Sequence, residues 1–137
     1  MLGRLKNIHE ELLAGIKTLE TAVQQSTPDL AGLTHARWRL SRASSHCRKF
    51  LTEAVYPALE QRQTADVRRL EELRTSGVAM LSESARHIAA WDTERIVADW
   101  AGYQRASAAV RAAMRDRIAA EKAVLYPLLE AAERNEG

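Results

Sequence analysis

Apolar residues recur every three or four positions along most of the chain, and this spacing gathers them on one side of an α-helix. In the first segment the apolar stripe consists of Leu2, Leu5, Leu12, Ile16, Leu19 and Val23. Such stripes predict helices over about residues 2–25, 28–62, 65–91 and 99–132. Because the connections between them are short, consecutive helices are expected to be antiparallel neighbours. The pattern predicts an all-α fold, an up-and-down antiparallel four-helix bundle formed by residues 1–137 as a single domain.

The second helix is predicted to begin at a capping sequence, and the third helix is predicted from the spacing of its apolar residues. Thr27, Pro28 and Asp29 resemble the start of a helix, with Thr27 as the N-cap and Pro28 at the first helical position. The third segment is expected to turn one stripe toward the core: Val67, Leu70, Gly77, Leu81, Ser84, Ile88 and Trp91.

The connection between the third and fourth helices departs from this simple scheme. Asp92 and Thr93 also resemble a helix start, yet a turn midway between Ser84 and Arg117 would fall near residue 100. A helix that began at Thr93 would start roughly 25 Å away from the end of the third helix at ~1.5 Å per residue, too far for two residues to span. We therefore expect a break near Asp92, then a short irregular or helical stretch, and a main fourth helix that begins close to Trp100.

The most distinctive motif is a short sequence containing Tyr-Pro that occurs twice in the chain. The segment 54–60 reads AVYPALE, and the segment 123–130 reads AVLYPLLE. Proline is normally excluded from helix interiors, because it lacks a backbone donor and clashes with the preceding turn. Two copies about 70 residues apart indicate two similar helical hairpins in one bundle.

Composition narrows the functional classes. The formal net charge is +2, which argues against a dedicated nucleic-acid binder. The single cysteine, Cys47, excludes an intramolecular disulfide, so a reducing cytoplasm is the simplest location. No segment reads as a secretory signal, and no apolar run approaches the ~18 residues of a membrane span. We expect a cytoplasmic protein without nucleic-acid or membrane partners.

Each predicted helix has a polar or small residue within its apolar stripe. These residues are His9 in the first helix, Cys47 in the second, Ser84 in the third, and Arg117 with Glu121 in the fourth. His9 and Cys47 are nearly equally far from the first turn, so they are expected at a similar height. The residues together predict a buried polar centre.

The segments 8–13 (IHEELL) and 117–130 make the chain similar to the hemerythrin-like, or HHE cation-binding, four-helix bundles. That family has a lone histidine in helix one, His-x-x-x-Glu before Phe-Pro or Tyr-Pro in helices two and four, and a histidine in helix three. The resemblance covers nearly the whole chain. It implies a four-helix bundle around a non-haem di-iron centre that interacts with oxygen, nitric oxide or peroxide.

The ligand positions implied by this resemblance are mostly altered. His9 matches the histidine of helix one, and Glu121 matches the carboxylate of helix four. The remaining positions hold Cys47, Leu51, Ser84 and Arg117. Two irons require several imidazole and carboxylate donors, and a guanidinium would repel them. The interpretation is a degenerate metal site in which the family's fold is kept and the di-iron centre is lost, so no cofactor is expected.

An ion pair is the predicted replacement for the metal. Arg117 and Glu121 are four residues apart and therefore neighbours on one helical face. Buried among His9, Cys47 and Ser84, the pair would satisfy its own hydrogen bonds. Removing one partner would leave an uncompensated buried charge, at a cost of roughly 3–5 kcal/mol.

Three functional hypotheses follow. The leading one is a non-enzymatic regulatory, stress-response or protein-interaction module that binds another protein or a second copy of itself. The first alternative is an iron-binding sensor or carrier for oxygen, nitric oxide or peroxide, with His9, Glu121 and Cys47 as ligands. The second is redox sensing through Cys47. A zinc site at His46, His87 and Glu83 is a further possibility. The possible interface is aromatic: Trp38, Trp91, Trp100 and Tyr103.

Overall fold

The computed structural model describes residues 1–62 and 66–136, and within them every regular element is helical. The elements are α1 (Leu2–Val23), α2 (Leu30–Phe50), the π-helical segment η1 (Leu51–Val55), α3 (Tyr56–Glu60), α4 (Val67–Ala90), α5 (Thr93–Ala98) and α6 (Trp100–Glu136). The all-α prediction is confirmed. The expected start of the third helix at residue 65 lies outside the described residues. No helix in the described part of the chain combines the length and apolar character that crossing a membrane requires.

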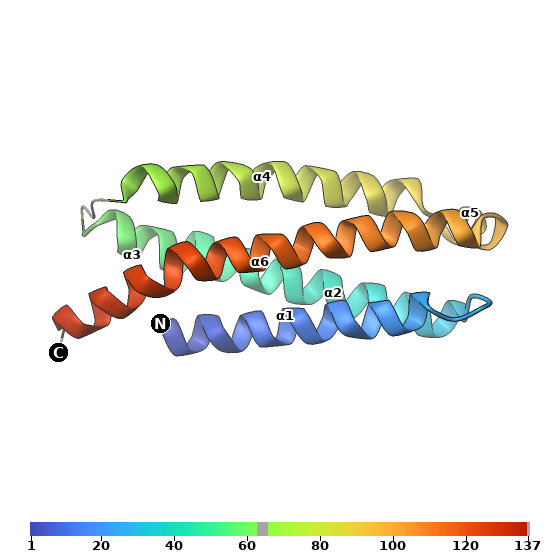
Figure 1. Ribbon diagram of the computed structural model, residues 1–137, viewed down its shortest axis with the longest axis horizontal. Helices are drawn as coiled ribbons and strands as arrows, with labels where there is room; N and C mark the ends of the chain where they lie inside the picture. The colour runs from blue at the N-terminus through green and yellow to red at the C-terminus, as the bar shows by residue number, and fades with distance from the viewer. Residues whose placement is uncertain (63–65, 137) are drawn as a thin grey trace.

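The four long helices contact one another in the order α2, α1, α6, α4, and α4 packs mainly along α6. α1 packs against both α2 and α6, whereas α4 runs beside α6 on the side away from α1 (Figure 1). In the described residues, the backbones of α4 and α2 make at most marginal contact. The end of α1 is joined to the start of α6, because Trp100 Nε1 donates to the Gln25 carbonyl (2.9 Å) and Gln104 Nε2 to the Val23 carbonyl (2.8 Å).

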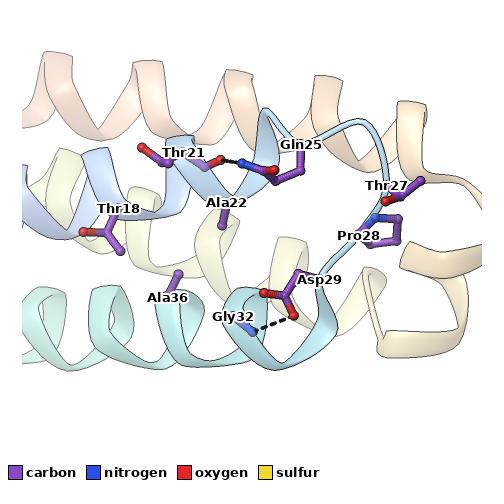
Figure 2. Close-up of a pocket in the computed structure, with 9 residues that line it drawn as sticks. All are labelled: Thr18, Thr21, Ala22, Gln25, Thr27, Pro28, Asp29, Gly32 and Ala36. Atoms are coloured by element: carbon purple, nitrogen blue, oxygen red, sulfur yellow. Dashed lines mark hydrogen bonds between the residues drawn. The ribbon is translucent and has the colours of Figure 1, made fainter.

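The turn between α1 and α2 is closed by local side-chain bonds. Asp29, rather than Thr27, is the N-cap of α2, and its Oδ1 accepts from the Gly32 amide at 3.3 Å (Figure 2). A Cβ at Gly32 would lie 2.5 Å from Asp29 Oδ2, so the close approach of this cap favours glycine. The predicted start at Pro28 was therefore two residues early, because the aspartate caps more effectively than the threonine in this geometry.

The break between the third and fourth helices is confirmed. α4 ends at Ala90, and Asp92 caps the short helix α5 by accepting from the Arg95 amide at 2.8 Å. Asp99 then caps the start of α6 through the Gly102 amide at 3.0 Å. The chain thus crosses from α4 to α6 through one helical segment, as the distance argument required.

The two Tyr-Pro motifs are both helical but differ in geometry. Before Pro57 the helix widens into η1, where the Tyr56 amide donates to the Leu51 carbonyl five residues back. A π segment of this kind accommodates an extra residue in a helix and is frequent at functional sites. Pro127 instead lies inside α6, which bends toward its C-terminal end (Figure 1).

The core matches the predicted stripe of the first helix and contradicts that of the third. In α1 the stripe is buried from Leu5 to Val23. In α4 only Leu70 and Leu73 are buried, whereas Leu81 and Ile88 are 41% and 53% exposed. The prediction of a fully buried third stripe was wrong, because α4 packs on α6 without closing against α2.

Candidate functional site: a buried polar centre and an open cleft

A buried carboxylate joins three elements at the centre of the molecule. Glu121 of α6 accepts a bond from His9 Nε2 at its Oε1 (2.7 Å) and one from Arg117 Nε at its Oε2 (2.7 Å). The histidine and the glutamate are almost fully buried. A buried carboxylate requires such donors, because removing it from water without them is costly. The arginine and the glutamate balance each other in charge.

The guanidinium of Arg117 is held by α4 as well. Its Nη1 donates to the Leu73 carbonyl at 2.6 Å and to Ser76 Oγ at 2.8 Å. Gly77 leaves room for this group, since a Cβ there would lie 2.7 Å from Nη2. The guanidinium is therefore held between α4 and α6, largely buried and at one end of an open cleft.

Ser84 was expected at this level and does not belong to the centre. It is half-buried and contributes no hydrogen bond to Arg117, whose partner on α4 is Ser76. The prediction assumed a turn centred near residue 100. The chain instead reverses around α5, whose middle is close to Ile96, so the residues that face Arg117 lie about two helical turns earlier.

Both tyrosines of the repeated motif reach the centre, and the sequence analysis did not assign them. Tyr126 Oη lies 2.7 Å from His9 Nδ1, and Arg117 Nη2 donates to Tyr56 Oη at 3.4 Å. An N–H at Nε2 donates to Glu121, which leaves Nδ1 to accept from the Tyr126 hydroxyl. The sequence contains a signal for these two tyrosines, because the repeated motif has a tyrosine directly before each proline.

Cys47 lies against the same carboxylate. Its thiol is buried and donates to Glu121 Oε1 at 3.7 Å, a long sulfur hydrogen bond. Burial, together with the negative charge of Glu121, raises the pKa of the Cys47 thiol far above its usual range. The sulfur is therefore held as a protonated thiol, which is a poor nucleophile and a poor metal ligand.

The donor set at the centre does not fit a di-iron group. In the described part of the chain, one group of three potential ligands lies close together: His9, Cys47 and Glu121, with ligand atoms within 4.8 Å of one another. Two metal ions need more donors than these, and the Arg117 guanidinium already binds one carboxylate oxygen. A single thiophilic ion would require loss of the thiol proton.

The other predicted residues form two separate groups. Tyr103 packs against Trp91 and Trp100, with ring centroids 5.5 and 5.9 Å apart, at the α5 end. Trp38 lies apart from them and is largely exposed. The proposed zinc ligands do not meet in the described residues: His87 stacks on Tyr103, and His46 Nδ1 lies 3.9 Å from a carboxylate oxygen of Glu11.

An open cleft leads from the polar centre toward the α5 end. Its volume is about 1220 Å³, and its walls are α2, α4 and α6. It exists because α4 stands away from α2. Side chains of the polar centre form one end, including Tyr56, Arg117 and Glu121, and Trp91 and Tyr103 form the other.

Comparison of the chain with known protein families, with curated proteins and with solved structures found no match.

Proposed function

We propose that the chain is a four-helix bundle of the hemerythrin-like type in which an ion pair replaces the metal, and that it acts as a non-catalytic regulatory or interaction module. The observation that supports this most directly is the 2.7 Å contact between Arg117 Nε and Glu121 Oε2 inside the polar centre. This contact uses the family's helix-four carboxylate position to bind a cationic side chain instead of iron.

The hydrogen bonding of the centre favours a structural role for these residues. Both ring nitrogens of His9 have partners, and each carboxylate oxygen of Glu121 has a donor. General acid–base catalysis needs a group with a free proton position within reach of a substrate. His9 and Glu121 are instead engaged with each other and shielded from solvent.

The environment of Cys47 bears on the redox alternative, and the set of potential ligands among the described residues bears on the metal-binding alternative. A redox sensor needs an accessible thiolate, and the buried, protonated Cys47 argues against it. Its unpaired thiol suits a reducing compartment such as the cytoplasm. The metal-binding alternative is favoured by one observation, the clustering of His9, Cys47 and Glu121.

Metal analysis of protein from iron-supplemented cells tests the proposal. We expect iron far below one ion per chain and no charge-transfer absorption. Stoichiometric iron with such absorption would support an oxygen, nitric oxide or peroxide sensor instead. Co²⁺ titration tests a single thiophilic ion: a sulfur-to-cobalt absorption band that is lost in Cys47→Ser would favour that alternative.

A further inference from the structure

The cleft between α2, α4 and α6 gathers exposed apolar side chains. Trp38 on α2 and Val78, Leu81 and Ile88 on α4 all line it. These side chains are between 41% and 71% exposed, and they face the same space. Large apolar side chains grouped around one hollow indicate a site that an apolar ligand covers.

One end of the cleft carries an uncompensated cation. Arg37 of α2 is half-buried, and its Cζ lies 5.7 Å from the centroid of the Tyr103 ring. Among the described residues it has no hydrogen-bond or ion-pair partner. Asp92 lines the same end, where its carboxylate caps the Arg95 amide and keeps its negative charge.

A second cation lines the cleft on α6 between Tyr103 and Arg117. Arg111 is buried, lines the cleft and pairs with Glu20 at 3.0 Å. The same carboxylate oxygen also pairs with Arg115 at 3.0 Å, so two guanidinium groups share one acid. Counting Arg37, Arg111 and Arg115 against Asp92 and Glu20 leaves an excess of one positive charge on this side of the cleft. Burial of an arginine beside apolar walls favours an anionic partner.

The length of the cleft matches one alkyl chain. From Gly77, beside the polar centre, to Trp91, at the α5 end, the chain rises roughly 20 Å at ~1.5 Å per residue. An acyl chain spans about 15 Å, half the hydrocarbon thickness of a bilayer. At the polar end, Arg74 and Arg117 already pair with Glu60 and Glu121, and the remaining cations that line it, Arg48 and Lys49, are exposed to solvent, whereas Arg37 is half-buried.

We propose that this cleft binds a long-chain carboxylate of the fatty-acid type, with its head group at Arg37 and its alkyl chain along Trp38, Leu81 and Val78 toward the polar centre. This inference rests on the proposed function, because it names the ligand that the non-catalytic module would bind. The two are tested separately: metal analysis addresses the polar centre, and ligand titration addresses the cleft.

Tryptophan fluorescence of the full chain, titrated with hexadecanoate below its micelle concentration, is the test. Trp38 and Trp91 line the cleft, so binding is expected to change their emission to a saturable limit. Arg37→Gln should weaken hexadecanoate binding at least tenfold. Arg39→Gln is the matched control, because Arg39 is exposed on the same helix and bonds Thr18 of α1 instead, and it should leave the affinity unchanged.

Two further arms separate the head group from the chain. Hexadecanol, with the same chain and no charge, should bind the wild-type protein and Arg37→Gln equally. Leu81→Glu should weaken both ligands, since it puts a carboxylate into the apolar wall. Circular dichroism establishes that each variant remains folded.

Several results would overturn the proposal. One is the lack of saturable hexadecanoate binding by the wild-type protein. Another is equal weakening by Arg37→Gln and Arg39→Gln. A dimer in light scattering that Leu81→Glu dissociates would assign the cleft to a second copy of this chain. Binding of an acidic amphipathic peptide, with none of hexadecanoate, would assign it to a protein partner.

Discussion

Replacing Arg117 with methionine removes the cation of the polar centre while keeping a side chain of similar length. The side chains of Arg117 and Glu121 are 14% and 6% exposed, so the carboxylate would stay buried without its charged partner. Breaking a buried pair costs about 3–5 kcal/mol of unfolding free energy. His9 still donates to the carboxylate at 2.7 Å, so we expect the lower end, about 3 kcal/mol. In a chain of this size, that loss lowers the Tm by roughly 10 °C.

Urea unfolding of four proteins measures this effect: the wild-type chain, Arg117→Met, Glu121→Gln and the double variant. Because the two side chains contact each other, the loss in the double variant should fall short of the sum of the single losses by at least about 1.5 kcal/mol. Arg39→Met, at an exposed arginine, is the control and should stay within about 0.5 kcal/mol of wild type. The reasoning is refuted if Arg117→Met behaves like Arg39→Met, or if the two single losses are additive.

Three further predictions concern the thiol, a histidine and a glycine. Cys47 should react with iodoacetamide at pH 8 at least a hundredfold more slowly in the native protein than in urea, because burial raises the pKa of its thiol; comparable rates would contradict this. Burial lowers the pKa of His87 below the ordinary value for histidine. The unfolded chain therefore binds the proton more tightly, and the free energy of unfolding falls as the pH drops from 7.5 to 5.5. His87→Gln should lessen that fall in urea titrations, and an unchanged slope would count against it. Gly77→Ala should be less stable than Gly3→Ala by calorimetry, because its Cβ would lie 2.7 Å from the Arg117 guanidinium, whereas nothing lies within 4 Å at Gly3; the reverse order would contradict the packing.

The sequence predicted those parts of the fold that depend on local periodicity. The α1 stripe from Leu5 to Val23 is buried because α1 has neighbours on two sides. The same kind of pattern in α4 failed at Leu81 and Ile88. A stripe identifies which face of a helix is apolar, but whether another helix covers that face depends on tertiary packing. The cleft was therefore invisible in the sequence.

The polar centre was predictable to the extent that its residues could be placed at one height. Their positions within the apolar stripes located Cys47 and Arg117, and four-residue spacing joined Arg117 to Glu121. Ser84 was misplaced because the chain reverses direction around α5, near Ile96, instead of near residue 100. The residues of α4 that face Arg117 therefore lie about two helical turns earlier than predicted. The tyrosine hydroxyls were overlooked because the repeat was analysed only for its prolines.

The central claim is that the Arg117 guanidinium occupies the position where a metal would otherwise be bound. A crystal structure of protein from iron-supplemented cells, with anomalous data at the iron absorption edge, tests it most directly. We predict no anomalous peak between His9 and Glu121, and continuous density for the guanidinium beside the Glu121 carboxylate. A peak bonded to these two side chains, or an Arg117 side chain turned out into solvent, would contradict the account.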